Sequence, residues 1–420
     1  MKVFQLGGQA AALSFFHHGS LDATIIGMTQ EFKNSMPIFQ GVGQFGTLRS
    51  PEAGAPRYIG VKFNDNFNLL YKDFDLTTPK YEEGEEIEPL YFLPVIPTVL
   101  LNGGSGIAVG FATKILNRSP VDLIDACISC LNGSPMRTLE PRVFGFNGTV
   151  TRKPEAPKTW IFRGKYEVKN TSTVEVTEVP PSFTYEKYEA LLDKLVEDGV
   201  IKSFEDHSSG GAHYVLKFAR ATLEELVKKN RLDSLLKMTE QVTENLTTLD
   251  ENGSLKVFSS AEELTAYFVS FRLGYYSKRK DFLVENLGKE IKTLTYRAAF
   301  IKAIIDGRIV IANTPKAELV AQIKGEGIPA QEGSYEFLLS MPMSSLTKEK
   351  FEELLKKKGE AEMELERVLK KEPREFYLED LKTLRKKVSG TRTPSPPQEP
   401  SAKEPSKEEG DSIFNWLGGK

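Results

Sequence analysis

Two long amphipathic segments with a compact segment between them are the feature that most constrains the fold. Ser260-Ala-Glu-Glu263 has the spacing of a capping box and predicts the start of the first helix. Apolar residues then recur at helical spacing as Leu283, Leu287, Ile291, Leu294, Ala298 and Ile301. The second segment runs over 347–388, and Gly359 and Pro373 predict interruptions in it. We expect an antiparallel coiled-coil arm with a small domain at its tip, although two helices of an ordinary bundle fit the same periodicity.

Composition bounds the class of protein. With 420 residues, the chain is long enough for two to four domains at about 100–200 residues per domain. No apolar stretch is long enough for a membrane helix, and the first residues lack the layout of a signal peptide, so we expect a cytoplasmic protein. Two Cys exclude a disulfide scaffold, and four His leave little material for a His-built metal site. The net charge of −3 argues against a protein that coats nucleic acid through bulk positive charge.

The middle and the end of the chain differ in pattern from the helical segments. Alternating apolar residues over 159–168 and 172–179 predict strands, and helical patterns at 185–197 and 221–237 complete an α+β module. Residues 389–420 are rich in Pro, Ser and Glu and predict a disordered tail. The apolar cluster Ile413–Leu417 at its tip is either a partner-docking peptide or a chance of composition.

Three short motifs have ordinary explanations. Gly41-Val-Gly-Gln-Phe-Gly46 matches G-x-G-x-x-G, but Pro37 precedes it and no helix pattern follows, so it does not predict a nucleotide site. Cys127 and Cys130 lie toward the C-terminal end of a helix pattern and predict two packed thiols. The adjacent pair His17-His18 precedes a helix pattern, a position that suits an anion such as phosphate as well as simple surface packing.

Arg57-Tyr58 is the remaining constellation. A Tyr hydroxyl has a pKa near ~10 and needs a neighbouring cation, base or metal ion before it can act as a nucleophile. An Arg-Tyr dipeptide by itself does not indicate such a role.

Taken in order, however, these motifs resemble the breakage-and-reunion region of type IIA DNA topoisomerases, which is found in gyrase A subunits and in eukaryotic topoisomerase II. Residues 96–103 and 112–116 look most like the medium subunit of a T-even-type phage topoisomerase. Five motifs carry the resemblance: His17-His18-Gly19, Ile25-Ile26-Gly27, Phe39–Gly46, Ala55-Pro56-Arg57-Tyr58 and Leu93–Gly110.

The resemblance implies a chemistry for particular residues. Tyr58 would attack a DNA phosphodiester and form a 5′-phosphotyrosine bond. Arg57 would stabilise the charge on the phosphate, and His18 would position or polarise it. His17, His18, Arg57 and Ile115 would contact DNA, with Ile115 as an apolar wedge that unstacks a base step. The sequence predicts no metal site in this chain.

The resemblance also implies a domain organisation of the α+β multidomain class. We expect a partial winged-helix domain with the catalytic Tyr over 1–120, a strand-rich tower domain over 121–258, a coiled coil with an exit-gate domain over 259–388, and the disordered tail over 389–420. Phe16 stands where relatives usually have Tyr. The early part of the winged-helix domain is missing before His17, so a separate N-terminal fragment is an expected complement.

The partners follow from the same family. We expect double-stranded DNA, a second copy of this chain, and a large topoisomerase subunit that carries the ATPase and the Mg2+ site. The chain would then be the cleavage subunit of an ATP-dependent type II enzyme, in the host cytoplasm if phage-encoded, with relaxation or decatenation favoured over supercoiling. The alternative is a catalytically silent dimerising scaffold. In either case the charge of −3 indicates that part of the DNA-binding surface lies on other chains.

Overall fold

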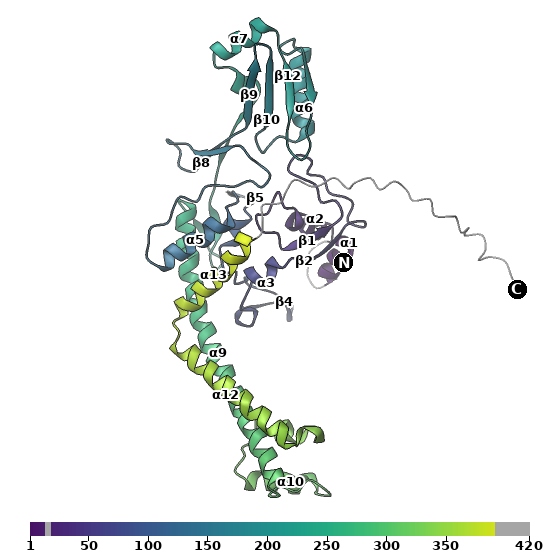
Figure 1. Cartoon of the computed structure of the whole chain (residues 1–420), viewed down its shortest axis with the longest axis vertical. Helices are drawn as coiled ribbons and strands as arrows, with labels where there is room; N and C mark the ends of the chain where they lie inside the picture. Colours follow the sequence, from purple (N-terminus) through teal and green to yellow (C-terminus); the bar gives the residue numbers. More distant parts are fainter. Residues whose placement is uncertain (13–17, 391–420) are drawn as a thin grey trace, which may run out of the picture. The chain divides into compact units, whose positions relative to one another are not determined.

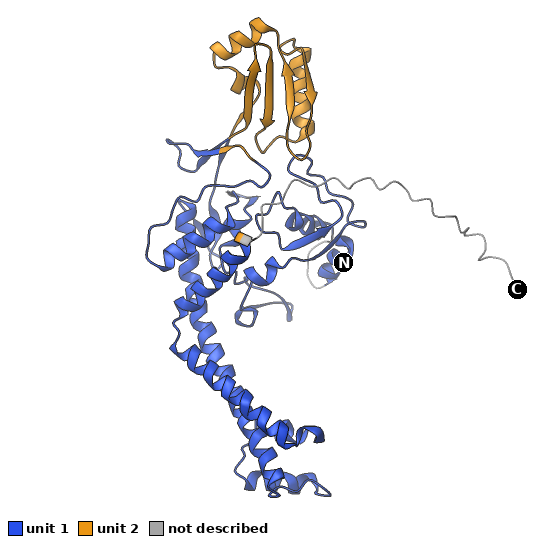
Figure 2. Cartoon of the chain, viewed as in Figure 1, with its two compact units in different colours: residues 1–146, 150–162, 241–388 blue, residues 147–149, 163–240, 389–420 orange. Residues whose placement is uncertain are grey.

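The computed structural model describes residues 1–12 and 18–390, which form a mixed α/β structure (Figure 1). The described residues divide into two compact units (Figure 2). Unit 1 contains Met1–Phe146, Val150–Phe162 and Gln241–Val388, and unit 2 contains Asn147–Thr149 and Arg163–Glu240.

Some sequence predictions fall outside these ranges. The tail beyond residue 390, with Ile413–Leu417, is not among the described residues, and neither are Phe16 and His17. Within the ranges that are described, no helix combines the length and the apolar character that crossing a membrane requires.

Unit 1 is built from helices and short antiparallel strand pairs. Its helices are α1 (Val3–Ala12), α2 (His18–Thr29), α3 (Asn66–Leu70), α4 (Thr98–Leu101), α5 (Pro120–Leu131), α9 (Ala261–Ile305), α10 (Lys316–Gly325), α11 (Glu336–Leu339), α12 (Lys348–Lys370) and α13 (Pro373–Gly390). Its strand pairs are β1 (Phe39–Val42) with β2 (Gly60–Phe63), β3 (Pro79–Glu82) with β4 (Glu85–Pro89), β5 (Gly104–Ala108) with β6 (Phe111–Ile115), and β14 (Thr247–Leu249) with β15 (Leu255–Val257). A three-stranded sheet in the order β13-β8-β7 (Thr239–Thr243, Thr159–Arg163, Thr149–Arg152) has most of its residues in this unit.

The main core of unit 1 joins segments that are far apart in the sequence. Leu100 of α4, Ile124 of α5, Tyr276 of α9 and Leu381 of α13 are all fully buried in one cluster. The rings of Tyr276 and Tyr377 stack with their centroids 4.4 Å apart. Burial of this apolar surface holds the base of the long helices against the N-terminal half of the chain.

The Gly-rich and Pro-rich segment 91–113 follows its prediction only in part. It is not a continuous helix, as Gly and Pro predicted. The sequence also predicted that the segment would be packed, which is correct for its first half, where Leu93 and Val95 are buried. The hairpin β5–β6 is exposed instead, and Ile107 and Val109 at its tip are 94% and 101% exposed.

The predicted long helix is confirmed as α9, which spans 45 residues. The Ser260 side chain accepts a hydrogen bond from the Glu263 amide, and the Glu263 carboxylate accepts from the Ser259 amide at 2.7 Å, so the capping box closes on the residue before the cap. The bond to the Glu263 amide satisfies one of the amides that a helix start leaves free.

Helices α9 and α12 pack side by side in opposite directions (Figure 1). Ile301, near the end of α9, shares a buried cluster with Leu354, near the start of α12. Lys280, earlier in α9, donates a hydrogen bond to the carbonyl of Leu369, near the end of α12. This order makes the pair antiparallel, and we call α9 with α12 the arm.

One predicted interruption of the second segment is wrong and the other is correct. Helix α12 continues through Gly359, because a single Gly costs a helix only about 1 kcal/mol and the packed seam outweighs it. The chain does break before Pro373, which becomes the first residue of α13. Pro is well tolerated there, since the first helical amide has no partner within the helix.

A small cluster closes the end of the arm that lies away from α5 (Figure 1). Phe300 of α9, Ile323 of α10 and Leu338 of α11 are buried together. The predicted compact segment between the two long helices is therefore a folded element with its own core.

Unit 2 is a four-stranded antiparallel sheet with three helices. The sheet order is β11-β12-β10-β9 (Ser203–Asp206, Tyr214–Lys217, Thr173–Glu178, Lys165–Asn170), and the helices are α6 (Tyr185–Glu197), α7 (Arg220–Lys228) and α8 (Leu232–Leu235). Val174, Tyr188 and Leu216 are fully buried between the sheet and its helices. The strand predicted at 172–179 and the helix predicted at 185–197 are confirmed as β10 and α6. The predicted strand at 159–168 instead divides into β8 and β9, which belong to different sheets, and the helical pattern at 221–237 divides into α7 and α8.

Removal of a seam side chain should destabilise the arm. Ile301 is fully buried, so Ile301→Ala should lower the free energy of unfolding by about 2–5 kcal/mol, the usual cost of a cavity left by a large aliphatic side chain. Thermal unfolding followed by circular dichroism measures this loss. Met363→Ala on α12 is the control, because Met363 is 66% exposed, and an equal loss in both variants would contradict the assignment of the seam.

Candidate active site

Tyr58 lies on a tight turn immediately before strand β2. The Tyr58 amide donates a hydrogen bond to the carbonyl of Ala55 at 2.9 Å, which closes the turn around Pro56 and Arg57. Pro favours this geometry because its ring fixes φ. The Tyr58 side chain is 72% exposed, so its hydroxyl is open to a large substrate.

Arg57 supplies a positive charge beside the Tyr58 ring. Its guanidinium carbon lies 5.9 Å from the centre of the Tyr58 ring, and its side chain is exposed. Arg is suited to phosphate because its planar N–H groups donate in pairs. The turn therefore presents a phenol and a guanidinium on one exposed surface.

The β1–β2 pair and helix α2 hold this turn on a small core. Ile59, next to Tyr58, is buried with Val3 of α1, Ile25 of α2 and Val61 of β2. His18 is the first residue of α2. For His18 the structure describes the backbone only, and His17 lies outside the described residues, so the positions of the two imidazoles remain a prediction.

The G-x-G-x-x-G motif lies in the loop that faces this core and forms no nucleotide site. It begins in β1, which pairs antiparallel with β2, and no helix follows it as a dinucleotide fold requires. A Cβ at Gly46, where φ is +78°, would lie 2.7 Å from the backbone of Pro51. The motif is thus explained by a tight loop.

Gln30 is a residue of this region that sequence reasoning missed. Its side chain is 3% exposed, and its amide nitrogen donates to the carbonyls of Phe45 at 2.9 Å and Pro51 at 3.1 Å. These two bonds hold the backbone of the loop that contains the G-x-G-x-x-G motif. No motif marks such a residue, since its partners are backbone carbonyls.

Ile115, the predicted DNA wedge, ends strand β6 and is only 4% exposed. It belongs to the main core together with Leu100 and Leu101. Asn245 pairs with the adjoining Lys114 through both backbone bonds, at 2.9 and 3.0 Å. Contact of Ile115 with a base step therefore requires that its side chain leave this core.

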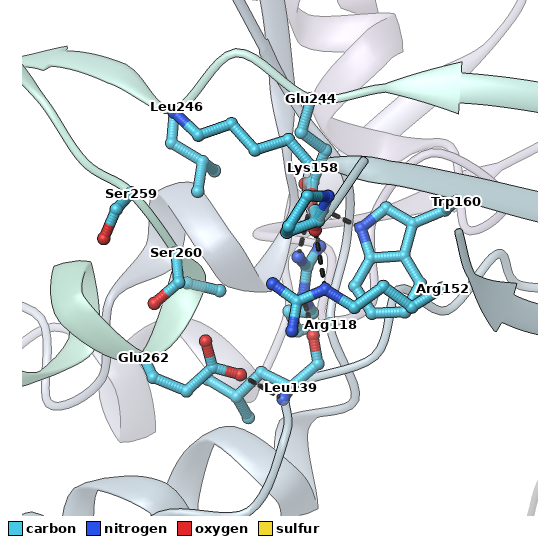
Figure 3. A pocket seen from close by; sticks show the side chains of 12 residues that line it. Arg118, Leu139, Arg152, Lys158, Trp160, Glu244, Leu246, Ser259, Ser260 and Glu262 are labelled. Atoms are coloured by element: carbon cyan, nitrogen blue, oxygen red, sulfur yellow. Dashed lines mark hydrogen bonds and ion pairs between the residues drawn. The ribbon is translucent and has the colours of Figure 1, made fainter. Parts of the chain in front are cut away.

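A buried ion pair fixes the backbone directly after Ile115 (Figure 3). Arg118 and Glu244 are 1% and 4% exposed and lie 2.7 Å apart, and the Trp160 indole donates to Glu244 at 2.8 Å. Glu244 accepts from the Leu116 amide at 2.8 Å, while Arg118 donates to the Leu116 carbonyl at 2.7 Å. Because the accompanying pocket has a volume of only about 10 Å³, it has room for one water and no ligand.

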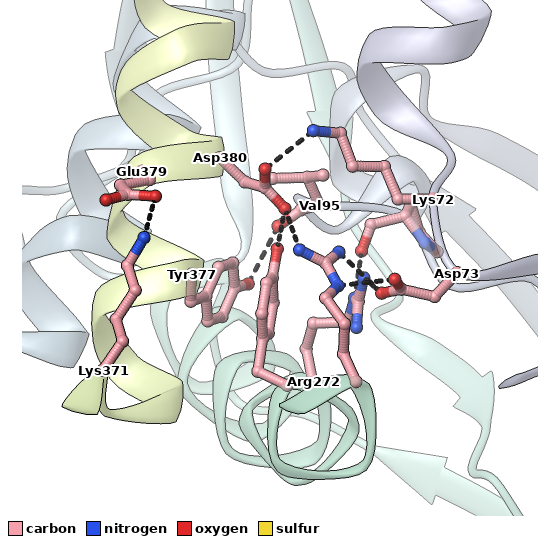
Figure 4. A network of polar contacts seen from close by, with 11 residues as sticks. Lys72, Asp73, Val95, Arg272, Lys371, Tyr377, Glu379 and Asp380 are labelled. Carbon is pink, nitrogen blue, oxygen red and sulfur yellow. Dashed lines mark hydrogen bonds and ion pairs between the residues drawn. The ribbon is translucent and has the colours of Figure 1, made fainter. Parts of the chain in front are cut away.

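A second polar network joins the base of the arm to Lys72 and Asp73, which follow helix α3 (Figure 4). Arg279 of α9 pairs with Asp73 at 2.5 Å and with Asp380 of α13 at 2.7 Å, and Arg272 donates to Asp73 at 2.5 Å. Burial alone would raise the pKa of Asp380, but the charges of Arg279 and Lys72 outweigh it and lower that pKa below its usual value.

Neither a metal site nor a reactive cysteine is found among the described residues. Among residues 1–12 and 18–390, no three His, Cys, Asp or Glu side chains gather as metal ligands would. Cys127 is buried, and its burial raises the pKa of the thiol, which disfavours the reactive thiolate. The prediction of two packed, unbonded thiols at Cys127 and Cys130 is confirmed.

Comparison with known proteins gives one consistent result. Residues 1–383 match the family of the DNA gyrase/topoisomerase IV A subunits. The chain is 31% identical over 405 residues to the mitochondrial DNA topoisomerase 2 of Dictyostelium discoideum, covering 92% of this chain and 31% of that protein. It is 30% identical over 436 residues to human DNA topoisomerase 2-alpha, covering 91% of this chain and 28% of that protein.

A solved structure agrees with the sequence relatives. The DNA-binding, cleavage and re-ligation domain of Plasmodium falciparum topoisomerase II superimposes with a TM-score of 0.86 at 28% identity, covering 93% of this chain and 58% of that one. The chain thus spans less than a third of the length of the two curated relatives, at 31% and 28%.

The Asp380 network makes a prediction about pH. Because the pKa of Asp380 is lowered by folding, its carboxylate stabilises the fold above its unfolded pKa of about 3.9, and this contribution is lost as pH falls through the folded value. Asp380→Asn should therefore destabilise the chain at pH 7 by about 1–3 kcal/mol, since it removes the carboxylate that Lys72 and Arg279 share, while Arg279 keeps Asp73. The difference from the wild type should shrink below about pH 4. Urea unfolding across this range measures it, and a difference independent of pH would contradict the assignment.

Proposed function

The chain belongs to the family of the DNA gyrase/topoisomerase IV A subunits, and from this premise we propose that it cleaves and religates duplex DNA as part of a type II topoisomerase. The observation that carries the proposal is Tyr58, exposed beside Arg57 on a turn closed by backbone hydrogen bonds. A phenol in such a position is open to a duplex too large to enter a pocket.

Tyr58 would act as the nucleophile. Its hydroxyl oxygen attacks the phosphorus of a DNA phosphodiester, the bond from phosphorus to the 3′ oxygen breaks, and the hydroxyl proton is ultimately balanced by protonation of the released 3′ oxygen. The product is a 5′-phosphotyrosine bond and a free 3′ hydroxyl. Attack of that hydroxyl on the same phosphorus reverses every step, so religation needs no external energy.

Arg57 and the histidines would stabilise the phosphate. The charge on the phosphate oxygens grows as the new bond forms, and the guanidinium of Arg57 can donate to them without moving far. His18 begins helix α2, where free backbone amides and the helix dipole also favour an anion. His17 would contact the same DNA strand.

Ile115 would act as the wedge that bends the duplex. Apolar side chains that enter a base step unstack it and kink the DNA. Since Ile115 is buried, we expect the hairpin β5–β6 to shift when DNA binds.

Members of the type II topoisomerase family use Mg2+ and ATP. The described residues of this chain do not fit a Mg2+ site, because no group of three carboxylate, His or Cys ligands is present among them. We therefore assign Mg2+ and ATP to a partner that carries the ATPase. Another copy of this chain would cut the other strand.

Substitution of Tyr58 tests this function. With the partner ATPase subunit, Mg2+, ATP and duplex DNA, Tyr58→Phe should reduce covalent protein–DNA adducts by ~10³-fold or more, because the attacking oxygen is removed. Adducts are counted on denaturing gels after trapping with detergent. Tyr81→Phe is the matched control, since Tyr81 is 61% exposed on the β3–β4 hairpin.

Two other outcomes would be informative. Unchanged adduct formation by Tyr58→Phe would mean that another group is the nucleophile. Absence of adducts from the wild type with all partners present would favour the catalytically silent dimerising scaffold instead.

A further inference from the structure

Residues 1–4 form a brace around the Tyr58 turn. Val61 donates its amide proton to the Met1 carbonyl at 2.8 Å, and Val3 donates to the carbonyl of Ile59 at 3.2 Å. Lys2 lies between them and is paired with Gly60 in an antiparallel bridge. The first residues of the chain thus pair with residues 59–61, which directly follow Tyr58.

The brace also contacts the turn itself. Phe4 donates its amide proton to the carbonyl of Pro56 at 3.2 Å. The side-chain ammonium of Lys2 donates to the carbonyl of Tyr58 at 2.7 Å. The main chain of the turn is therefore held from the brace at both Pro56 and Tyr58.

The backbone that carries the Lys2 ammonium is held in place although the Lys2 side chain is exposed. Val3 is fully buried with Ile25 and Ile59, so the backbone of the brace cannot slide without opening this core. A short hydrogen bond from a charged donor is stronger than one between neutral groups. The Tyr58 side chain, by contrast, is 72% exposed and has little packing of its own to set its direction.

We propose that Lys2 is a positioning residue for the cleavage reaction, which holds the backbone of Tyr58 where its hydroxyl meets the phosphate in line. The inference rests on the proposed function of Tyr58. Its physical basis is that a nucleophile displaced by about 1 Å can lose ~10²-fold in rate. With little side-chain packing to hold Tyr58, its direction depends on its main chain, and Lys2 holds the carbonyl of that same residue.

The test compares Lys2 with Lys62, a second exposed lysine of unit 1. Lys2→Met keeps the aliphatic length and removes the donor, while Lys62→Met makes the same charge change on the exposed face of β2. In the complex with the partner ATPase subunit, Mg2+ and ATP, Lys2→Met should slow cleavage at saturating DNA by about 10- to 100-fold. Its Kd for duplex DNA should stay within about threefold, and Lys62→Met should change neither quantity appreciably.

Two further readouts separate positioning from a merely structural role. Lys2→Arg keeps a charged donor and should retain the cleavage rate within about threefold. Because positioning acts on the barrier shared by cleavage and religation, Lys2→Met should slow both and leave the equilibrium fraction of adduct unchanged. A thermal midpoint equal to that of the wild type should accompany these results.

Several results would overturn the inference. A wild-type rate in Lys2→Met, a loss in Lys2→Arg as large as in Lys2→Met, or a slower rate that merely follows a lower thermal midpoint would each do so. None of these would touch the proposed function, since the wild type would still form the Tyr58 adduct. Failure of the wild type to form adducts would instead overturn the proposed function, and with it this inference.

Discussion

The base of the arm is held by buried charged groups that pair across distant segments of the chain. Burying a guanidinium or a carboxylate costs several kcal/mol unless it is paired, so Arg272 and Arg279 fix α9 wherever Asp73 and Asp380 are. A shift of α9 would break these charged pairs as well as the apolar contacts around them. Helix α9, helix α13 and the segment that carries Asp73 are therefore held together in unit 1. The turn with Tyr58 belongs to the same unit.

Local sequence patterns predicted individual helices and strands better than they predicted which distant residues contact them. The cap at Ser260 and the apolar period that follows it were sufficient for α9, because both signals lie within the helix. Gly359 was misread, since tertiary packing outweighs a local cost. The bond between Asp73 and Arg272 joins residues 199 apart, and no periodicity in the sequence indicates which distant charge a buried charge will meet.

The candidate site divides in the same way. Tyr58 and Arg57 could be proposed from the sequence only because a family motif surrounds them, since an Arg-Tyr dipeptide by itself indicates no role. Lys2 and Gln30 could not, because both bind main-chain carbonyls, which every residue carries. The accessibility of Ile115 was also beyond the sequence, since burial depends on what packs over a strand.

The hairpin β5–β6 has a consequence for how the chain behaves in solution. Its tip places the almost fully exposed Ile107 and Val109 in a stretch, 104–113, that contains no charged residue. Apolar surface of this kind is stabilised by any contact that removes it from water, and charge is what normally keeps strand edges apart. At high concentration, we therefore expect the isolated chain to self-associate through this tip. Whatever covers the tip raises the apparent stability of the chain by mass action.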